Sequence, residues 1–262
     1  MTRLATPRRW NSLVLTTAAL SLVPMADIAF AQINTQDAQI WTVAEGGEGG
    51  EAGAVANATA DVAYLGQLGI VEGHMRAARD LYAKGQVDEA IGLSYHPEAE
   101  MMDAVRETLT AHNVPDITLA MTEFSQKMEA GAPLAEVEAA LVAVQQAIDV
   151  AMAAKADDTR VRFDAVVLLL SAAAHEYSGS IENGAVSDSM AYLESYEFIA
   201  TAKDWLTELA AVNAKVADKA LSALAATADA YGDINGANLK AGDPAVLAGV
   251  AAQVELYVSQ VR

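Results

Sequence analysis

The sequence predicts an all-α protein: an antiparallel helical bundle preceded by a flexible arm rich in glycine and glutamate. Apolar residues recur at three- and four-residue spacing over long stretches, which is typical of helices with one buried face. The strict alternation of apolar and polar residues that indicates strands is nearly absent. Alanine and leucine, two of the strongest helix formers, dominate the composition, and the chain has only 6 prolines.

The first residues, 1–31, have the pattern of a secretory signal peptide. A basic start is followed by a short apolar run at 13–23 and by the small-residue cleavage site Ala29-Phe30-Ala31. We therefore expect a mature chain that begins at Gln32 and is periplasmic or secreted. A membrane anchor is disfavoured because a spanning helix needs about 20 apolar residues. The pair Arg8-Arg9 keeps a twin-arginine signal as an alternative to the general secretory route.

Composition excludes several function classes. The chain has no cysteine, which removes disulfides, a lipid-modified cysteine, covalent c-type haem, iron–sulfur ligation and thiol catalysis. The formal net charge of −19 would repel nucleic acid and anionic lipid, so neither is expected as a partner. No later segment approaches the length of a membrane span, so no membrane insertion is expected after signal cleavage. Cations, basic proteins or solubility alone would explain the charge.

Residues 32–60 differ from the rest of the chain and are predicted to form the arm. Their centre, Glu45 to Glu51, repeats glycine and glutamate, a composition that is flexible and cannot build a core. A solvated, disordered arm is one interpretation; the other is a mobile loop that offers carboxylates to a hard cation. A phosphate-binding loop is disfavoured because no lysine accompanies the glycines.

A helical-bundle domain is predicted over 61–262. Its first helix is expected at 61–84 and ends at Gly85, and a short helix follows at 87–94. Pro97 suits the first turn of a helix that continues to about His112. Asn183-Gly184 predicts a turn. The remaining helices are expected near 116–129, 133–155, 157–182, 188–231 and 243–261.

Two of the four histidines stand at equal distances from a predicted turn: His74 before Gly85 and His96 after it. Residues equidistant from the turn of an antiparallel helix hairpin lie at the same height and can face each other. Carboxylates are close in sequence, at Glu72 and Glu100. The spacing therefore suggests a metal site at this height of the hairpin.

Imidazole and carboxylate groups together suit iron, zinc, manganese or copper. We predict His74, His96 and Glu100 as ligands, with Glu72 as the second choice of carboxylate. Thioethers of neighbouring methionines would favour copper(I), although the nearest, Met75, belongs to the apolar face of its helix. The alternative is that His74 is a half-buried core residue and His96 a junction residue that caps a helix.

Aromatic and acidic residues flank the Asn183-Gly184 turn. His175-Glu176-Tyr177 precedes it, and Tyr192, Glu194, Tyr196 and Glu197 follow. Glu176 and Tyr192 are equidistant from Gly184, so they are expected to meet across this hairpin. Core packing at helical spacing is the alternative for Tyr192, Tyr196 and Phe198.

This segment resembles periplasmic iron-handling proteins, namely the imelysin-like proteins and the extracytoplasmic regions of bacterial iron permeases. The matching positions are Glu176, Tyr177, Gly184, Tyr192, Tyr196 and Phe198. The resemblance implies an all-helical bundle and periplasmic iron handling. The chain departs from the Gly-x-His-x-x-Glu motif of imelysin-like proteins, because Gly73-His74 has no intervening residue.

Together these observations predict a periplasmic metal-binding protein, with iron as the expected ion, that serves uptake or storage and has an envelope transporter or receptor as partner. The alternative is a helical adaptor of the cell envelope that holds no metal. An enzyme is not expected, since Ser178-Gly179-Ser180 lacks a strand-to-helix elbow and no Gly-x-Ser-x-Gly motif occurs.

Overall fold

The computed structural model describes residues 49–155, 157–234 and 239–261, which all belong to the unit of the chain at 42–262. The expected signal peptide and the first part of the arm, 32–48, lie outside the described residues, so secretion and localisation stay predictions. Apart from one short strand pair, the regular secondary structure of the described residues is helical, and the all-α class is confirmed. None of the described helices is long and apolar enough to cross a membrane.

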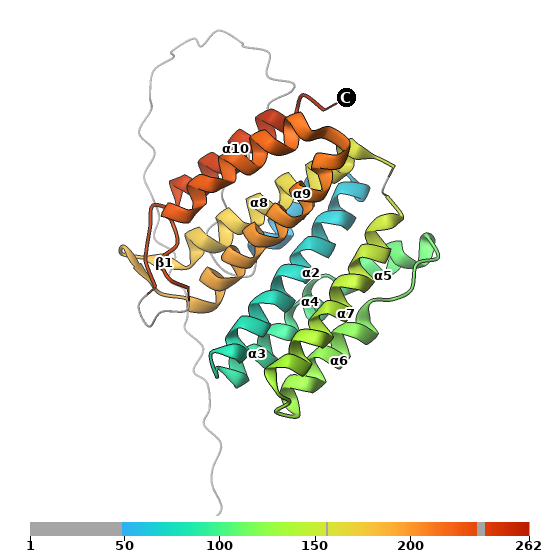
Figure 1. Ribbon diagram of the computed structural model, residues 1–262, viewed down its shortest axis with the longest axis vertical. Helices are drawn as coiled ribbons and strands as arrows, with labels where there is room; N and C mark the ends of the chain where they lie inside the picture. The colour runs from blue at the N-terminus through green and yellow to red at the C-terminus, as the bar shows by residue number, and fades with distance from the viewer. Residues whose placement is uncertain (1–48, 156, 235–238, 262) are drawn as a thin grey trace, which may run out of the picture. The chain divides into compact units, whose positions relative to one another are not determined.

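Figure 1 shows the arrangement of the helices, which run side by side as a bundle. In chain order the elements are α1 (Gly49–Ala56), α2 (Ala60–Ala83), α3 (Val87–Ser94), α4 (His96–Glu100), α5 (Met102–Ala111), α6 (Thr118–Glu129), α7 (Leu134–Ala153), α8 (Thr159–Gly179), β1 (Ile181–Glu182), β2 (Ala185–Val186), α9 (Ser189–Leu224), the 3₁₀ helix η1 (Ala225–Asp229) and α10 (Ala245–Val258).

Several observed boundaries differ from the predicted ones, and two of these differences affect the N-terminal arm and the site. Helical structure begins at Gly49, inside the predicted arm 32–60, because α1 packs against α8 and buries Ala54. The single helix predicted after Pro97 is divided into α4 and α5 at Met101, whose φ of −137° leaves the helical region. The second difference matters for the site, because it gives His96 a short helix of its own.

Helix α2 is the centre of the bundle and contacts α3, α7, α8 and α9. Thr59 caps its first turn by accepting a hydrogen bond from the backbone N–H of Val62. Gly73 lies in close contact with the Phe198 ring of α9: a Cβ atom added there would be 2.2 Å from Cδ1 of Phe198. Only glycine fits at this point of contact, so the sequence at Gly73 sets how closely α9 can approach the residue that follows, His74.

Two turns with left-handed backbone connect the helices that carry the site. Gly85, with φ of +77°, ends α2 and reverses the chain into α3, as predicted. Asn183 and Gly184, with φ of +53° and +76°, form the turn between α8 and α9, and the flanking residues pair as β1 and β2. Asp188 then caps α9 by accepting hydrogen bonds from two backbone N–H groups of its first turn.

Candidate metal centre

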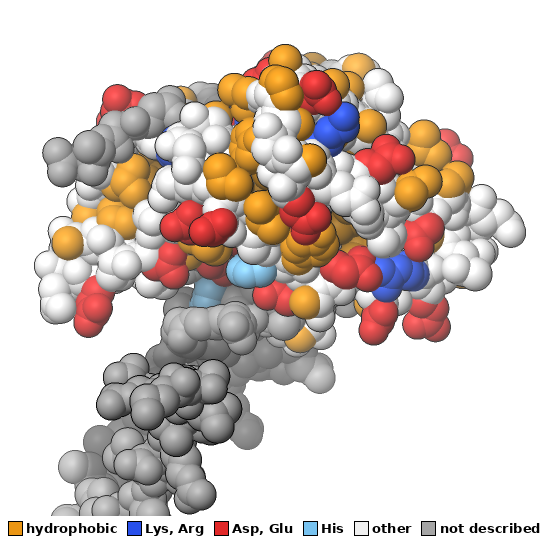
Figure 2. All heavy atoms as spheres, turned by 90° about the horizontal axis from the view of Figure 1, so that it is seen from below, with side chains coloured by type: hydrophobic (Ala, Val, Ile, Leu, Met, Phe, Trp, Pro, Cys, Tyr) orange, Lys and Arg blue, Asp and Glu red, His pale blue; other side chains and the backbone are white. Residues whose placement is uncertain are grey.

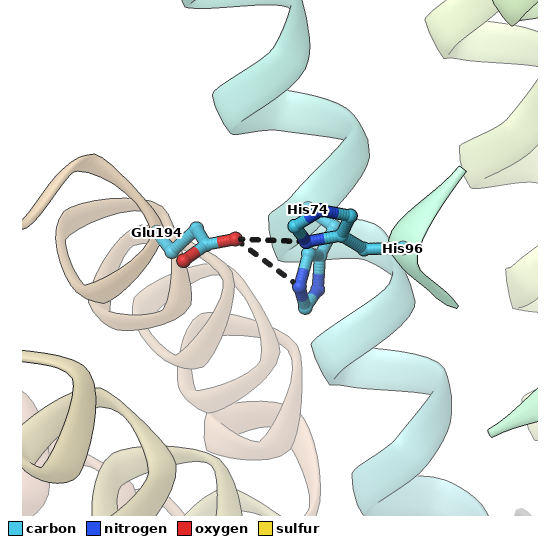
Figure 3. Close-up of side chains that lie close together, drawn as sticks. All are labelled: His74, His96 and Glu194. Atoms are coloured by element: carbon cyan, nitrogen blue, oxygen red, sulfur yellow. Dashed lines mark ion pairs between the residues drawn. The ribbon is translucent and has the colours of Figure 1, made fainter. Parts of the chain in front are cut away.

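Three side chains from three different helices converge on one point: His74 from α2, His96 from α4 and Glu194 from α9 (Figure 3). One potential ligand atom from each lies within 4.8 Å of the other two. Oε1 of Glu194 is 3.3 Å from Nε2 of His74 and 4.0 Å from Nδ1 of His96. The two imidazole rings have centroids 6.2 Å apart. The structure therefore brings the two histidines together across the Gly85 hairpin and adds a carboxylate from α9.

The orientation of the His74 ring is fixed by a backbone hydrogen bond. Its Nδ1 lies 2.9 Å from the carbonyl oxygen of Ile70. A carbonyl can only accept, so Nδ1 carries the hydrogen, and in the neutral ring Nε2 has the lone pair. Nε2 is the nitrogen that faces Glu194. Histidines that ligate metals characteristically donate their other ring N–H in this way, which fixes the tautomer and the ring direction.

The His74–Glu194 side of the centre is dry. His74 is 2% exposed and Glu194 6% exposed, and the His74 ring packs against Phe198 with centroids 5.4 Å apart. A buried carboxylate is costly unless a positive charge or several hydrogen bonds compensate it. Arg76 forms its ion pairs with Glu197 and other carboxylates rather than with Glu194. A cation held with His74, or a second proton on its ring, would compensate Glu194.

The His96 side of the centre is open to solvent. The His96 side chain is 45% exposed and belongs to the first residue of α4. Figure 2 shows histidine side chains at the surface on one face of the molecule, where aspartate and glutamate side chains gather around them. Three protein ligands with an open side leave positions for water or for exchange of the ion, unlike the closed four-ligand geometry of structural zinc sites.

The two carboxylates predicted from sequence do not join this cluster. Glu72 is buried, but it accepts a hydrogen bond from Gln145 of α7 at 3.0 Å and pairs with Arg76. Each helical residue turns the side-chain direction by about 100°, so Glu72 lies almost opposite to His74 on α2. Burial raises the pKa of Glu72 above its ordinary value. Glu100 is exposed at the end of α4. The structure supplies Glu194 in their place.

The tyrosines of the second predicted group are core residues that hold a loop. Tyr177 and Tyr192 are buried, and their ring centroids lie 5.5 Å apart across the α8–α9 hairpin. The hydroxyl of Tyr177 donates to the carbonyl of Ala230 at 2.6 Å and accepts from the backbone N–H of Gly242 at 2.8 Å. Tyr192 donates to the carbonyl of Lys240 at 2.9 Å. The core-packing alternative therefore describes Tyr192, and Tyr177 lies in the same buried group.

A separate charged group lies along the contact between α2 and α9. Nε of Arg76 is 2.8 Å from the carboxylate of Glu197, and its Nη1 is 2.6 Å from that of Asp204. Glu197 is 3% exposed. Burial, together with the nearby negative charge of Asp80, raises the pKa of Glu197 to about 7 although Arg76 opposes the shift. This carboxyl group therefore titrates close to neutral pH.

Residues 152–261 match the family model of the iron permease-associated 4-helix bundle domain. This range includes α8, β1, β2, α9, η1 and α10, and the kink of α9 at Asn213 divides that helix into two parts. The match confirms the predicted resemblance to the extracytoplasmic region of iron permeases and associates the chain with iron uptake. It includes Glu194, whereas His74 and His96 precede it. No curated protein and no solved structure matched the chain.

Proposed function

We propose that the protein binds a transition-metal ion through His74, His96 and Glu194, that iron is this ion, and that the protein serves iron uptake or storage in the periplasm. The observation that carries the proposal is the convergence of these three side chains from three helices, of which α9 is far from α2 and α4 in sequence. The hydrogen bond from Nδ1 of His74 to Ile70 supports a ligand role, because it directs Nε2 toward the common point.

The donor set narrows the choice of ion. Two imidazoles and one carboxylate with open positions are the ligands typical of non-haem iron(II) sites, and the same groups bind zinc. Copper(I) is less suited, because Met75 and Met102, whose thioethers would favour it, are fully buried among the core residues. Among the remaining ions, the match of residues 152–261 to an iron permease-associated domain supports iron.

Metal binding by the purified mature protein tests the proposal. We expect stoichiometric binding in calorimetric titrations with anaerobic iron(II) and with zinc. Loss of a residue that supports a ligand typically lowers metal affinity by about 10- to 100-fold. Loss of a ligand itself should lower it further, so we expect His74→Ala to weaken binding by more than about 100-fold. His112→Ala is the matched control, since His112 is exposed at the end of α5 and outside the cluster.

Two results would overturn the proposal. One is a wild-type protein that binds neither ion stoichiometrically, which would leave the interpretation as a helical adaptor of the envelope. The other is equal affinity in the wild type, His74→Ala and His112→Ala, which would place any bound ion elsewhere on this acidic chain.

A further inference from the structure

His96 has less local support than the other two residues of the centre. It begins α4, a helix of only 5 residues whose N-cap residue, Tyr95, makes no side-chain capping hydrogen bond. The backbone breaks again at Met101, before α5. Such a short helix is not stable by itself, so its position depends on contacts with its surroundings. Pro97 is buried and anchors one side of α4.

Arg106 of α5 holds the other side. Its Nη2 forms an ion pair with Glu98 of α4, and its Nη1 lies 3.1 Å from Asp103. Its Nε is 3.3 Å from Oγ1 of Thr118 and 3.4 Å from the carboxylate of Asp116. One planar guanidinium thus joins α4, α5 and the start of α6.

We infer that Arg106 is a positioning residue for the metal centre: it fixes α4 and thereby the place of the His96 imidazole. The inference rests on the function proposed above. The groups that Arg106 contacts at the start of α6 are themselves fixed by hydrogen bonds: Oδ1 of Asp116 accepts from both the N–H and the hydroxyl of Thr118, at 2.8 and 2.6 Å. Glu98 is two residues from His96, so a shift of α4 moves both.

A positioning role for Arg106 and a purely electrostatic role predict opposite effects of its loss on metal affinity. Exposed ion pairs contribute little to stability, so loss of Arg106 should leave the protein folded. Its loss leaves Glu98, Asp103 and Asp116 uncompensated, and a more negative surface attracts cations more strongly. A positioning role predicts weaker binding instead. Metal–ligand distances tolerate only about 0.2 Å, and supporting residues typically change affinity by 10- to 100-fold.

The experiment is zinc titration of the wild type, Arg106→Met and Arg106→Lys, each with and without His96→Ala. We expect both Arg106 variants to bind zinc about 10-fold more weakly, although the lysine variant keeps the charge. In the His96→Ala background, Arg106→Met should have no further effect, because the residue acts through His96. Arg160→Met is the control, because this substitution removes the same charge. Arg160 forms its ion pair with Asp164 within α8.

Unchanged or tighter zinc binding by Arg106→Met overturns the inference, and so does a loss that adds to that of His96→Ala, which would indicate a general structural role. If the methionine variant fails to fold, Arg106→Lys and Glu98→Gln provide the same comparison from the two sides of the ion pair. A wild type that binds no zinc or iron contradicts the proposed function instead, so the two failures are distinguishable.

Discussion

Oε1 of Glu194 lies 3.3 Å from Nε2 of His74, and this contact joins α9 to α2 beside the close approach of Gly73 to Phe198. It also joins the part of the chain that matches a known family model to a part that lies before the match. Glu194 lies in the segment that matches the iron permease-associated domain, and His74 lies before it. The candidate centre is therefore assembled only when α2 packs against this segment.

The first prediction separates the ligand set of the structure from that expected from sequence. Glu194→Gln keeps the size of the side chain but removes the charge, so we expect iron(II) and zinc to bind at least 10-fold more weakly. Glu100→Gln should leave the affinity within about twofold, because Glu100 is exposed and outside the cluster. Calorimetric titration of both variants measures this. A larger loss in Glu100→Gln than in Glu194→Gln would favour the ligands predicted from sequence.

The second prediction concerns the close approach at Gly73. A Cβ atom there would lie 2.2 Å from Phe198, so Gly73→Ala must displace α9 or the ring in a close-packed core. We expect the free energy of unfolding to fall by about 1–3 kcal/mol, and metal binding to weaken as Glu194 moves from His74. Gly92→Ala in α3 is the control, since a Cβ there meets nothing within 4 Å. Urea denaturation that shows equal stability in both variants would contradict this account.

The helix pair about Gly85 could be predicted from sequence because its signals are local. A glycine that ends a helix and two histidines equidistant from it suffice to place His74 and His96 at one height. The pairing with Glu194 could not be predicted in this way, because it depends on which faces of α2 and α9 meet. Gly73 beside His74 was the available signal, since a small residue at a helix contact indicates close approach.

The separation of Glu72 from the cluster of His74, His96 and Glu194 has a simple geometric cause. Glu72 is close to His74 in sequence, but two helical steps rotate the side-chain direction by about 200°. The carboxylate therefore reaches Gln145 of α7 instead of His74. A helical projection of α2 would have separated the two residues, although it could not have identified their partners.

The third prediction is a pH dependence of stability that comes from Glu197. Its pKa of about 7, against an ordinary value of 4.5, means that the folded protein binds the proton more tightly than the unfolded chain. The stabilisation is complete below about pH 4.5 and is lost as the pH rises through about 7. Relative to Glu197→Gln, which resembles the protonated carboxyl, the wild type should lose about 1–3 kcal/mol between about pH 5 and pH 8.

Urea denaturation of both proteins across this pH range measures the difference between their free energies of unfolding. The contributions of groups that titrate in both proteins cancel in this difference. Parallel curves for the wild type and Glu197→Gln would show that Arg76 keeps Glu197 ionised throughout. A wild type that gains stability with rising pH relative to the variant would mean that the pKa of Glu197 is lowered, against the effect of burial.

The last prediction tests the loop that the tyrosines hold. Tyr177→Phe removes a hydroxyl that bonds the carbonyl of Ala230 and the N–H of Gly242, and leaves both without this partner. We expect a loss of about 1–3 kcal/mol in unfolding free energy and faster hydrogen exchange at the Gly242 amide. Tyr95→Phe is the control: Tyr95 is 40% exposed and its hydroxyl donates to the exposed Glu129, so loss of the hydroxyl should cost less than about 0.5 kcal/mol in unfolding free energy. Unchanged exchange at Gly242 in Tyr177→Phe would show that the loop is held by its packing and not by this hydroxyl.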